Sequence, residues 1–179
     1  ERLRKSIDHH QFLAGTNFTL SYFALHLRFD KVLKNEEFRF YVLFILLFTA
    51  AITIIMVFFM NVDPEKAFRE GLFQVVSILT TTGYVTADYL SWLPVLGMLI
   101  FLLMFFGGSA GSTGGGVKIM RVSLLLKNSV LELKRLIHPN AVIPVRFNKI
   151  AVPPEIVQNV LAFVSFYLVI TVTSTIVMS

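Results

Sequence analysis

Cysteine is absent from all 179 residues of this chain. Its absence excludes disulfide bonds, thiolate metal ligands and a cysteine nucleophile within this sequence. Charge is also scarce, since Asp, Glu, Lys and Arg make up 15% of the residues, whereas a soluble domain carries roughly 25%. Apolar residues are abundant instead: 55% of the chain is hydrophobic and the mean hydropathy is +0.73. This composition predicts an integral membrane protein.

Two segments are uncharged over a length that crosses a bilayer. Residues 40–60 contain no charge, and as a helix they would be roughly 30 Å long, the thickness of one hydrocarbon core. Arg39 precedes this segment. Residues 156–179 form a second uncharged run, entered after Pro153 and Pro154. Each segment predicts a transmembrane helix.

A less regular region lies between these two spans. Asp63 and Pro64 form a typical helix start, with Asp as the N-cap and Pro at the first helical position. A helix over residues 65–79 would be roughly 22 Å long, which is too short to cross a membrane. A third apolar helix is expected over residues 93–106. It runs into residues 107–116, which hold six of the ten glycines.

The basic residues predict how the chain is oriented. Seven of the 16 Lys and Arg residues lie in residues 1–39, and seven lie in residues 118–149. By the positive-inside rule both blocks are cytoplasmic. Residues 61–92 would then begin and end outside, so the short helix enters the membrane and the chain returns as a loop. Such non-helical backbone is tolerated at membrane depth where it lines a water-filled path.

The returning loop contains the sequence TTGYV, residues 81–85. A dehydrated K⁺ ion needs several oxygens in place of its water shell, and rings of backbone carbonyls supply them. Glycine permits the unusual torsions that this requires, and the C-terminus of the preceding helix presents partial negative charge. The loop resembles the potassium-channel pattern Thr-Val-Gly-Tyr-Gly, from which it departs at the second and fifth positions. A plain turn between a helix and a span is the alternative interpretation.

We therefore predict a selectivity filter in this loop. The predicted filter residues are Thr81, Thr82, Gly83, Tyr84 and Val85, with K⁺ coordinated by the backbone carbonyls of Thr81, Thr82, Gly83 and Tyr84.

The glycine run is not a phosphate-binding loop. That motif needs Lys directly after its last Gly, and here Val117 separates Gly116 from Lys118. A Gly-x3-Gly helix contact stays open as an alternative. However, each Gly weakens a helix by about 1 kcal/mol relative to Ala. We predict instead a helix broken by an irregular intramembrane loop under the filter, which acts as a gate. The predicted gate residues are Gly107, Gly108, Ser109, Gly111, Ser112, Thr113, Gly114, Gly115, Gly116 and Lys118.

The sequence FFGGSAGSTGGGVKIMRV, following the filter-like TTTGY, closely resembles the Trk/Ktr/HKT superfamily of potassium transporters, and within it the bacterial Trk-H-type potassium uptake subunits. Residues 13–22 look like the end of that family's second repeat, and residues 138–148 look like its linker into the fourth. The resemblance implies an all-α integral membrane protein with four repeats around one ion path. Each repeat consists of a helix, a re-entrant pore helix with its filter loop, and a second helix, which in this chain is broken by the Gly-rich loop.

The resemblance also implies how the chain divides. Residues 1–39 would be the end of the preceding repeat and a cytoplasmic linker, and residues 40–127 a complete repeat. Residues 128–155 would be a second cytoplasmic linker, and residues 156–179 the first helix of the next repeat. The sequence is thus expected to be a fragment of a longer chain, and one repeat cannot enclose a pore.

The function implied by the resemblance is potassium uptake across the bacterial inner membrane by a multi-pass protein that is not an enzyme. The expected partners are K⁺, the lipid bilayer, a second copy in a homodimer, and a cytoplasmic nucleotide-binding regulatory subunit of Trk-A type. No cofactor is expected on this chain, because any nucleotide would lie on the regulatory partner. No nucleic acid is expected.

Two other functions remain open. A membrane-bound transferase would need acids or histidines clustered near one membrane face, and Asp63, Asp88 and the dispersed His9, His10, His26 and His138 form no motif. A helical assembly or anchor protein without transport would use the glycines as a packing surface, and it would tolerate a bulky residue at Gly83.

Overall fold

The computed structural model describes residues 29–112, 114–137, 144–148 and 150–178. The four histidines, Thr113, the family-like residues 13–22 and part of the linker at 138–148 lie outside the described residues. The described chain is predominantly helical and divides into two compact units, Glu1–Ile119 and Met120–Ser179.

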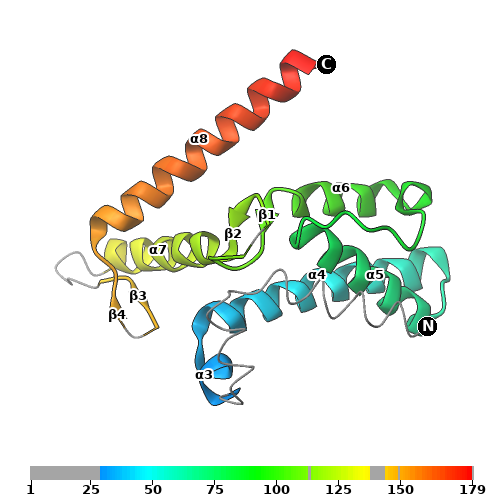
Figure 1. Cartoon of the computed structure of the whole chain (residues 1–179), viewed down its shortest axis with the longest axis horizontal. Coiled ribbons are helices and arrows are strands. Elements are labelled where there is room, and N and C mark those ends of the chain that lie inside the picture. Colours follow the sequence, from blue (N-terminus) through cyan, green and yellow to red (C-terminus); the bar gives the residue numbers. More distant parts are fainter. Residues whose placement is uncertain (1–28, 113, 138–143, 149, 179) are drawn as a thin grey trace. The chain divides into compact units, whose positions relative to one another are not determined.

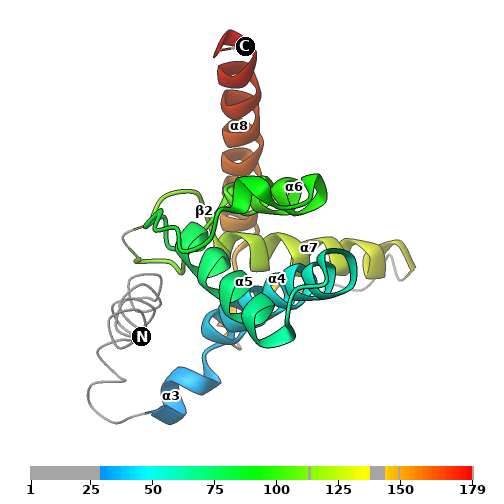
Figure 2. The ribbon, with the colours of Figure 1, turned by 90° about the vertical axis from the view of Figure 1, so that its right-hand side faces the viewer.

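The first unit is built on three helices, α4 (Glu36–Met60), α5 (Pro64–Leu79) and α6 (Pro94–Leu103). These three helices pack against one another, as both ribbon views show (Figures 1 and 2). The unit also contains the short helix α3 (Phe29–Lys34), the 3-10 turn η1 (Tyr89–Ser91), and the two-residue strands β1 (Phe106–Gly107) and β2 (Val117–Lys118).

Helix α4 confirms the uncharged helix expected over residues 40–60, but it begins at Glu36. The earlier start has a local cause: the side-chain oxygen of Asn35 accepts hydrogen bonds from the backbone N–H of Glu37 at 2.8 Å and of Phe38 at 3.3 Å. These bonds satisfy two of the amides that a helix start leaves without partners. The helix ends at Asn61, which adopts a left-handed conformation with φ of 50°.

Opposite faces of α4 are both apolar. One face is buried, with Tyr41, Ile45 and Ile52 in the core that α4 shares with α5 and α6. Other apolar side chains of the helix, including Leu47 and Phe58, are exposed. A helix that is apolar on every face is typical of a membrane span, and α4 is long and apolar enough to cross a bilayer.

Helix α5 confirms the short helix expected over residues 65–79. Asp63 caps it by accepting a hydrogen bond from the backbone N–H of Lys66 at 3.4 Å, and Pro64 occupies the first helical position. Its 16 residues give a length of roughly 24 Å. Helix α5 ends before Thr80, directly in front of residues 81–85.

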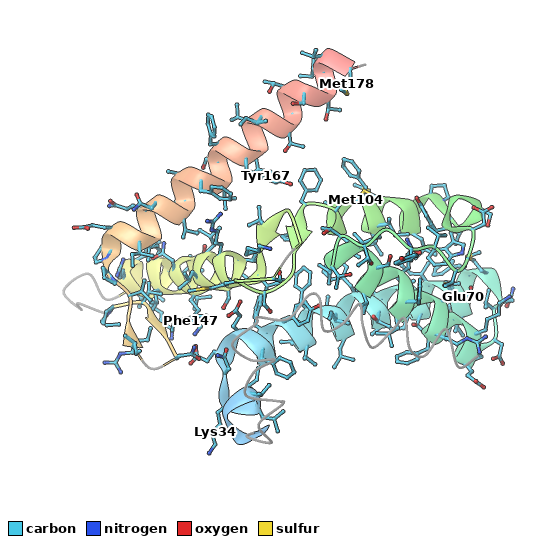
Figure 3. All side chains as sticks on the ribbon, viewed as in Figure 1. Lys34, Glu70, Met104, Phe147, Tyr167 and Met178 are labelled. Carbon is cyan, nitrogen blue, oxygen red and sulfur yellow. The ribbon has the colours of Figure 1, made fainter. Side chains whose placement is uncertain are left out.

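Helix α6 ends earlier than the expected residue 106. Beyond Met104, at its C-terminal end (Figure 3), the chain enters β1, which pairs in parallel with β2. Phe106 lies opposite Val117, and Gly107 lies opposite Lys118. The described chain is mostly helical, as expected. The two-residue strands flank the glycine run, where the glycines do not sustain a helix.

The second unit contains α7 (Ile119–Ile137, whose first residue belongs to the first unit), the antiparallel strands β3 (Arg146–Phe147) and β4 (Ile150–Ala151), and α8 (Pro154–Met178). Leu124, Phe147 and Val157 belong to its small core. The Arg121 guanidinium lies 3.8 Å from the ring centroid of Phe163.

The bounds of α7 and α8 can be compared with the segments expected from the sequence. Helix α7 continues through residue 128, where a linker was expected to begin, and ends only at Ile137. Helix α8 confirms the apolar helix expected over residues 156–179 and is long and apolar enough to cross a bilayer. Apolar side chains line its whole length, up to Met178 (Figure 3).

Candidate functional site

The C-terminal end of α5 carries buried hydroxyl groups that hold the following loop. The side chains of Ser77 and Thr80 are both buried. Ser77 Oγ donates a hydrogen bond to the backbone carbonyl of Tyr84 at 2.6 Å, and Thr80 Oγ1 donates to the carbonyl of Val76 at 2.8 Å. Since buried hydroxyls need hydrogen-bond partners, these bonds fix where the loop leaves the helix.

Residues 81–85 turn sharply away from α5. Two of them have positive backbone φ angles, 56° at Thr81 and 71° at Gly83. The backbone N–H groups of Thr82 and Gly83 both turn back toward the carbonyl of Ser77, at 3.1 Å and 3.4 Å. A positive φ is ordinary for Gly but strained for a β-branched residue such as Thr81, and such strain is often stored at functional sites.

Most of the 81–85 segment is open on its outer side. All five residues of the segment are exposed. The segment follows the last turn of α5 directly, so the partial negative charge of that helix end lies beside it. An exposed segment beside a helix C-terminus suits a cation better than an anion.

The Gly-rich loop, residues 107–116, is closed at its base by the pairing of β1 with β2. The backbone there approaches so closely that a Cβ atom at Gly107 would lie 1.9 Å from the carbonyl oxygen of Gly115. Only glycine fits at this position. Further along, the N–H of Ser112 donates to the carbonyl of Ser109 at 3.0 Å, forming a turn at the far end of the loop.

Lys118 holds this loop from its C-terminal side. Its Nζ donates to the backbone carbonyl and to Oγ of Ser112, each at 3.1 Å, and also to the carbonyl of Gly114. An ammonium group has three donors, so one side chain bonds to three oxygens of the loop. Lys118 therefore restricts the backbone of a segment whose glycines are conformationally permissive.

The Gly-rich loop contacts the 81–85 segment directly. The N–H of Gly115 donates to Thr81 Oγ1 at 3.4 Å. A Cβ atom at Gly114 would lie 3.1 Å from Thr81 Oγ1 and 3.3 Å from the carbonyl oxygen of Thr80. Two sequence motifs more than twenty residues apart thus form one site.

The remaining residues of the predicted gate also fall in or beside this loop. Gly108 accepts a hydrogen bond from the N–H of Ile119 at 3.1 Å, Ser109 is buried, and Gly111 and Gly116 have positive φ angles of 77° and 74°. Thr113 lies outside the described residues. Within the described part of the chain, no group of three or more His, Asp or Glu residues is placed to hold a metal ion.

Sequence reasoning missed one residue that contacts the loop. Glu37, in the first turn of α4, is buried, and its Oε1 accepts a hydrogen bond from the N–H of Ala110 at 2.5 Å. The sequence gives no signal for this contact, since an acid in a first helical turn is ordinary. The contacts of Ser77 and Thr80 were also missed, although hydroxyl residues at the C-terminal end of a short helix are a usable signal.

Comparisons with known proteins agree on one family. The TrkH family model, described as "Cation transport protein", matches residues 12–179. The Trk system potassium uptake protein TrkH of Halomonas elongata is 43% identical over 71% of this chain and 27% of its own length. The protein of the same name from Vibrio parahaemolyticus is 36% identical over 89% of this chain and 34% of its own length.

A solved structure agrees with these sequence matches. The crystal structure of the potassium transporter TrkH from Vibrio parahaemolyticus superimposes with a TM-score of 0.85 at 34% identity, covering 93% of this chain and 36% of that one. The chain therefore spans about a third of the length of these relatives.

Proposed function

Because this chain belongs to the TrkH family of cation transport proteins, we propose that it supplies one filter segment and the gate loop of a potassium uptake protein. The family is one of transporters, not of enzymes. In this proposal, residues 81–85 form the filter segment, and the Gly-rich loop is the gate.

One observation carries the proposal: the Gly-rich loop packs against the 81–85 segment at Thr81. An ion that left the carbonyls of residues 81–84 on that side would meet the loop next. A gate placed there controls the path without taking part in ion selection. The short helix α5 supports the same assignment, since its C-terminal end favours a cation beside residues 81–85.

The proposed mechanism is coordination followed by release. The carbonyl oxygens of residues 81–84 replace part of the hydration shell of K⁺, and the other filter segments of the full protein complete it. Ser77 fixes the filter segment through its hydrogen bond to the carbonyl of Tyr84, while Thr80 bonds back to Val76 at the end of α5. Movement of the Gly-rich loop away from Thr81 then opens the inner path.

The setting of this function is also a proposal, based on what the family resemblance implies. We propose a multi-pass protein of the bacterial inner membrane that forms a homodimer and is regulated by a cytoplasmic, nucleotide-binding subunit of Trk-A type. The apolar helices α4 and α8, each long enough to cross a bilayer, support the membrane location. The division into residues 1–39, 40–127, 128–155 and 156–179 is part of the same proposal.

The test is ⁸⁶Rb⁺ uptake into proteoliposomes by the full-length protein with Gly83→Asp. A Cβ atom at Gly83 would have no neighbour within 4 Å, and Asp tolerates a positive φ better than most residues, so the variant should fold. Its carboxylate would lie in the ion path and hold the cation there. We expect uptake to fall about tenfold or more, which corresponds to roughly 1.4 kcal/mol.

The matched control is Gly97→Ala, in α6, where a Cβ atom also has no neighbour within 4 Å. This variant should transport like wild type. Equal uptake by wild type and a folded Gly83→Asp variant would show that residues 81–85 do not line the path, and would favour an assembly or anchor role. If wild type itself is inactive, adding the regulatory subunit decides whether transport needs that partner.

A further inference from the structure

The Gly-rich loop is attached to α4 as well as to its own flanking residue Lys118. The contact is made by Glu37, whose Oε1 accepts the N–H of Ala110 across 73 residues of sequence at 2.5 Å. Lys118 bonds to Ser112 and Gly114, farther along the loop. Glu37 therefore connects the loop to a different helix, whereas Lys118 is part of β2 at the loop's own end.

The environment of Glu37 makes this contact strong. Only 4% of the residue is exposed, and a buried carboxylate without partners is costly. Its position in the first turn of α4 places the negative charge at the positive end of that helix. The loop cannot leave this position without depriving Ala110 of its acceptor.

The loop is thus held at two separate places. Gly115 contacts Thr81 beside the proposed filter, and Ala110 contacts Glu37 at the start of α4. Ala110 lies inside the turn that the Ser109–Ser112 hydrogen bond closes. A change at Glu37 is therefore transmitted along a short segment to the contact with Thr81.

We propose that Glu37 is a positioning residue that anchors the Gly-rich loop against the 81–85 segment, and that breaking its hydrogen bond to Ala110 is a required step when the loop moves. The consequence for transport rests on the function proposed above; the anchoring itself does not. The hydrogen bond from Ala110 joins Glu37 to the Gly-rich loop, so Glu37 acts on the 81–85 segment through the loop.

The test separates the reach of the side chain from its charge. Glu37→Asp keeps the charge at the start of α4 but is one methylene too short to reach Ala110. Glu37→Gln loses the charge but keeps an oxygen at the same reach. If Glu37 anchors the loop, the Glu37→Asp variant loses the contact with Ala110 and releases the loop. The Glu37→Gln variant largely retains that contact. A role in helix stabilisation alone predicts the reverse order.

The first measurement is hydrogen–deuterium exchange of the full-length protein, followed on peptides that cover residues 107–116. We expect exchange there to be about tenfold faster in Glu37→Asp and Glu37→Ala, since a lost hydrogen bond of about 1.4 kcal/mol gives that factor. Glu37→Gln should stay near wild type. Glu65→Ala is the control, because Glu65 is an exposed acid in the first turn of α5.

The second measurement is ⁸⁶Rb⁺ uptake without the regulatory subunit, which should rise severalfold in Glu37→Asp. Unchanged exchange at residues 107–116 in Glu37→Asp would overturn the anchor, as would faster exchange in Glu37→Gln alone. Faster exchange with unchanged uptake would support the anchor and contradict the gate role of the loop. Glu37→Asp retains the helix-end charge, so a failure of Glu37→Ala to fold leaves the test intact.

Discussion

At the scale of single residues, Ser77 links the helix before the proposed filter to the filter itself. Its hydroxyl donates to the carbonyl of Tyr84 from a fully buried position. A carbonyl oxygen has two lone pairs, so this bond leaves one of them for a cation. The same hydroxyl therefore positions a carbonyl and adjusts its capacity to bind an ion.

Replacing Ser77 by Ala should loosen the 81–85 segment without unfolding the protein. The loss of one buried hydrogen bond costs about 1 kcal/mol, and the carbonyl of Tyr84 becomes free to reorient. We expect weaker preference for K⁺ over Na⁺, measured as inhibition of ⁸⁶Rb⁺ uptake by added Na⁺. Ser91→Ala is the matched control, since Ser91 Oγ also donates to a carbonyl, that of Asp88, at 2.6 Å, but at an exposed position. Equal Na⁺ inhibition in both variants would refute the role of Ser77.

The residues of this site differ in how far the sequence predicts them. Gly83 can be selected from its motif, because a positive φ is what glycine provides. The positive φ of Thr81 cannot, since β-branched residues rarely adopt it. The role of Glu37 could not be predicted for another reason. Its partner Ala110 lies 73 residues away in the sequence, so no local sequence pattern indicates the contact.

At the scale of elements, the apolar helices α4, α6 and α8 and the short helix α5 were predictable, and the strands were not. The charge-free run predicts α4 to within a few residues, and the cap at Asp63 predicts the start of α5; the cap at Asn35, which starts α4 earlier, is seen only in the structure. The pairing of β1 with β2 joins residues on either side of the glycines, and strands of two residues leave no periodic signal. That pairing ends α6 early.

The packing of the Gly-rich loop predicts which of its glycines can be replaced by Ala with the smaller loss of stability. Gly107→Ala places Cβ 1.9 Å from a backbone oxygen, so β1 and β2 must separate. Gly114→Ala brings Cβ to 3.1 Å from Thr81 Oγ1, which a small shift accommodates. We therefore expect Gly107→Ala to destabilise the full-length protein by about 1–3 kcal/mol, which lowers its Tm in detergent by several degrees. Gly114→Ala should change ⁸⁶Rb⁺ uptake with little loss of Tm. The opposite order would show that the loop is packed differently.

At the scale of the whole molecule, the chain exposes apolar surface that water does not favour. Large side chains such as Phe58 on α4 and Phe166 on α8 are open in the described structure. Such faces are expected to meet lipid or the rest of a longer protein. The relatives, of which this chain spans about a third, have the length to supply that protein surface.

This comparison predicts that residues 1–179 alone do not transport. In the proposed fold, one repeat provides one of four filter segments, so it completes neither the coordination shell nor the pore. Proteoliposomes containing only this chain should show ⁸⁶Rb⁺ uptake at the level of empty vesicles, while the full-length protein shows uptake above it. Saturable uptake by the isolated chain would contradict the four-repeat arrangement or indicate self-assembly.

The pairing of β1 with β2 has a thermal consequence. Because Phe106 and Val117 keep the ends of the Gly-rich loop together, the residues between them can become disordered without any additional cost of loop closure. Glycine gains more conformational entropy on release than any other residue. The hydrogen bonds from Lys118 and to Glu37 oppose this release enthalpically. Warming therefore favours release of the loop, and if the loop is the proposed gate, ion flux should increase more steeply with temperature than diffusion through a permanently open path.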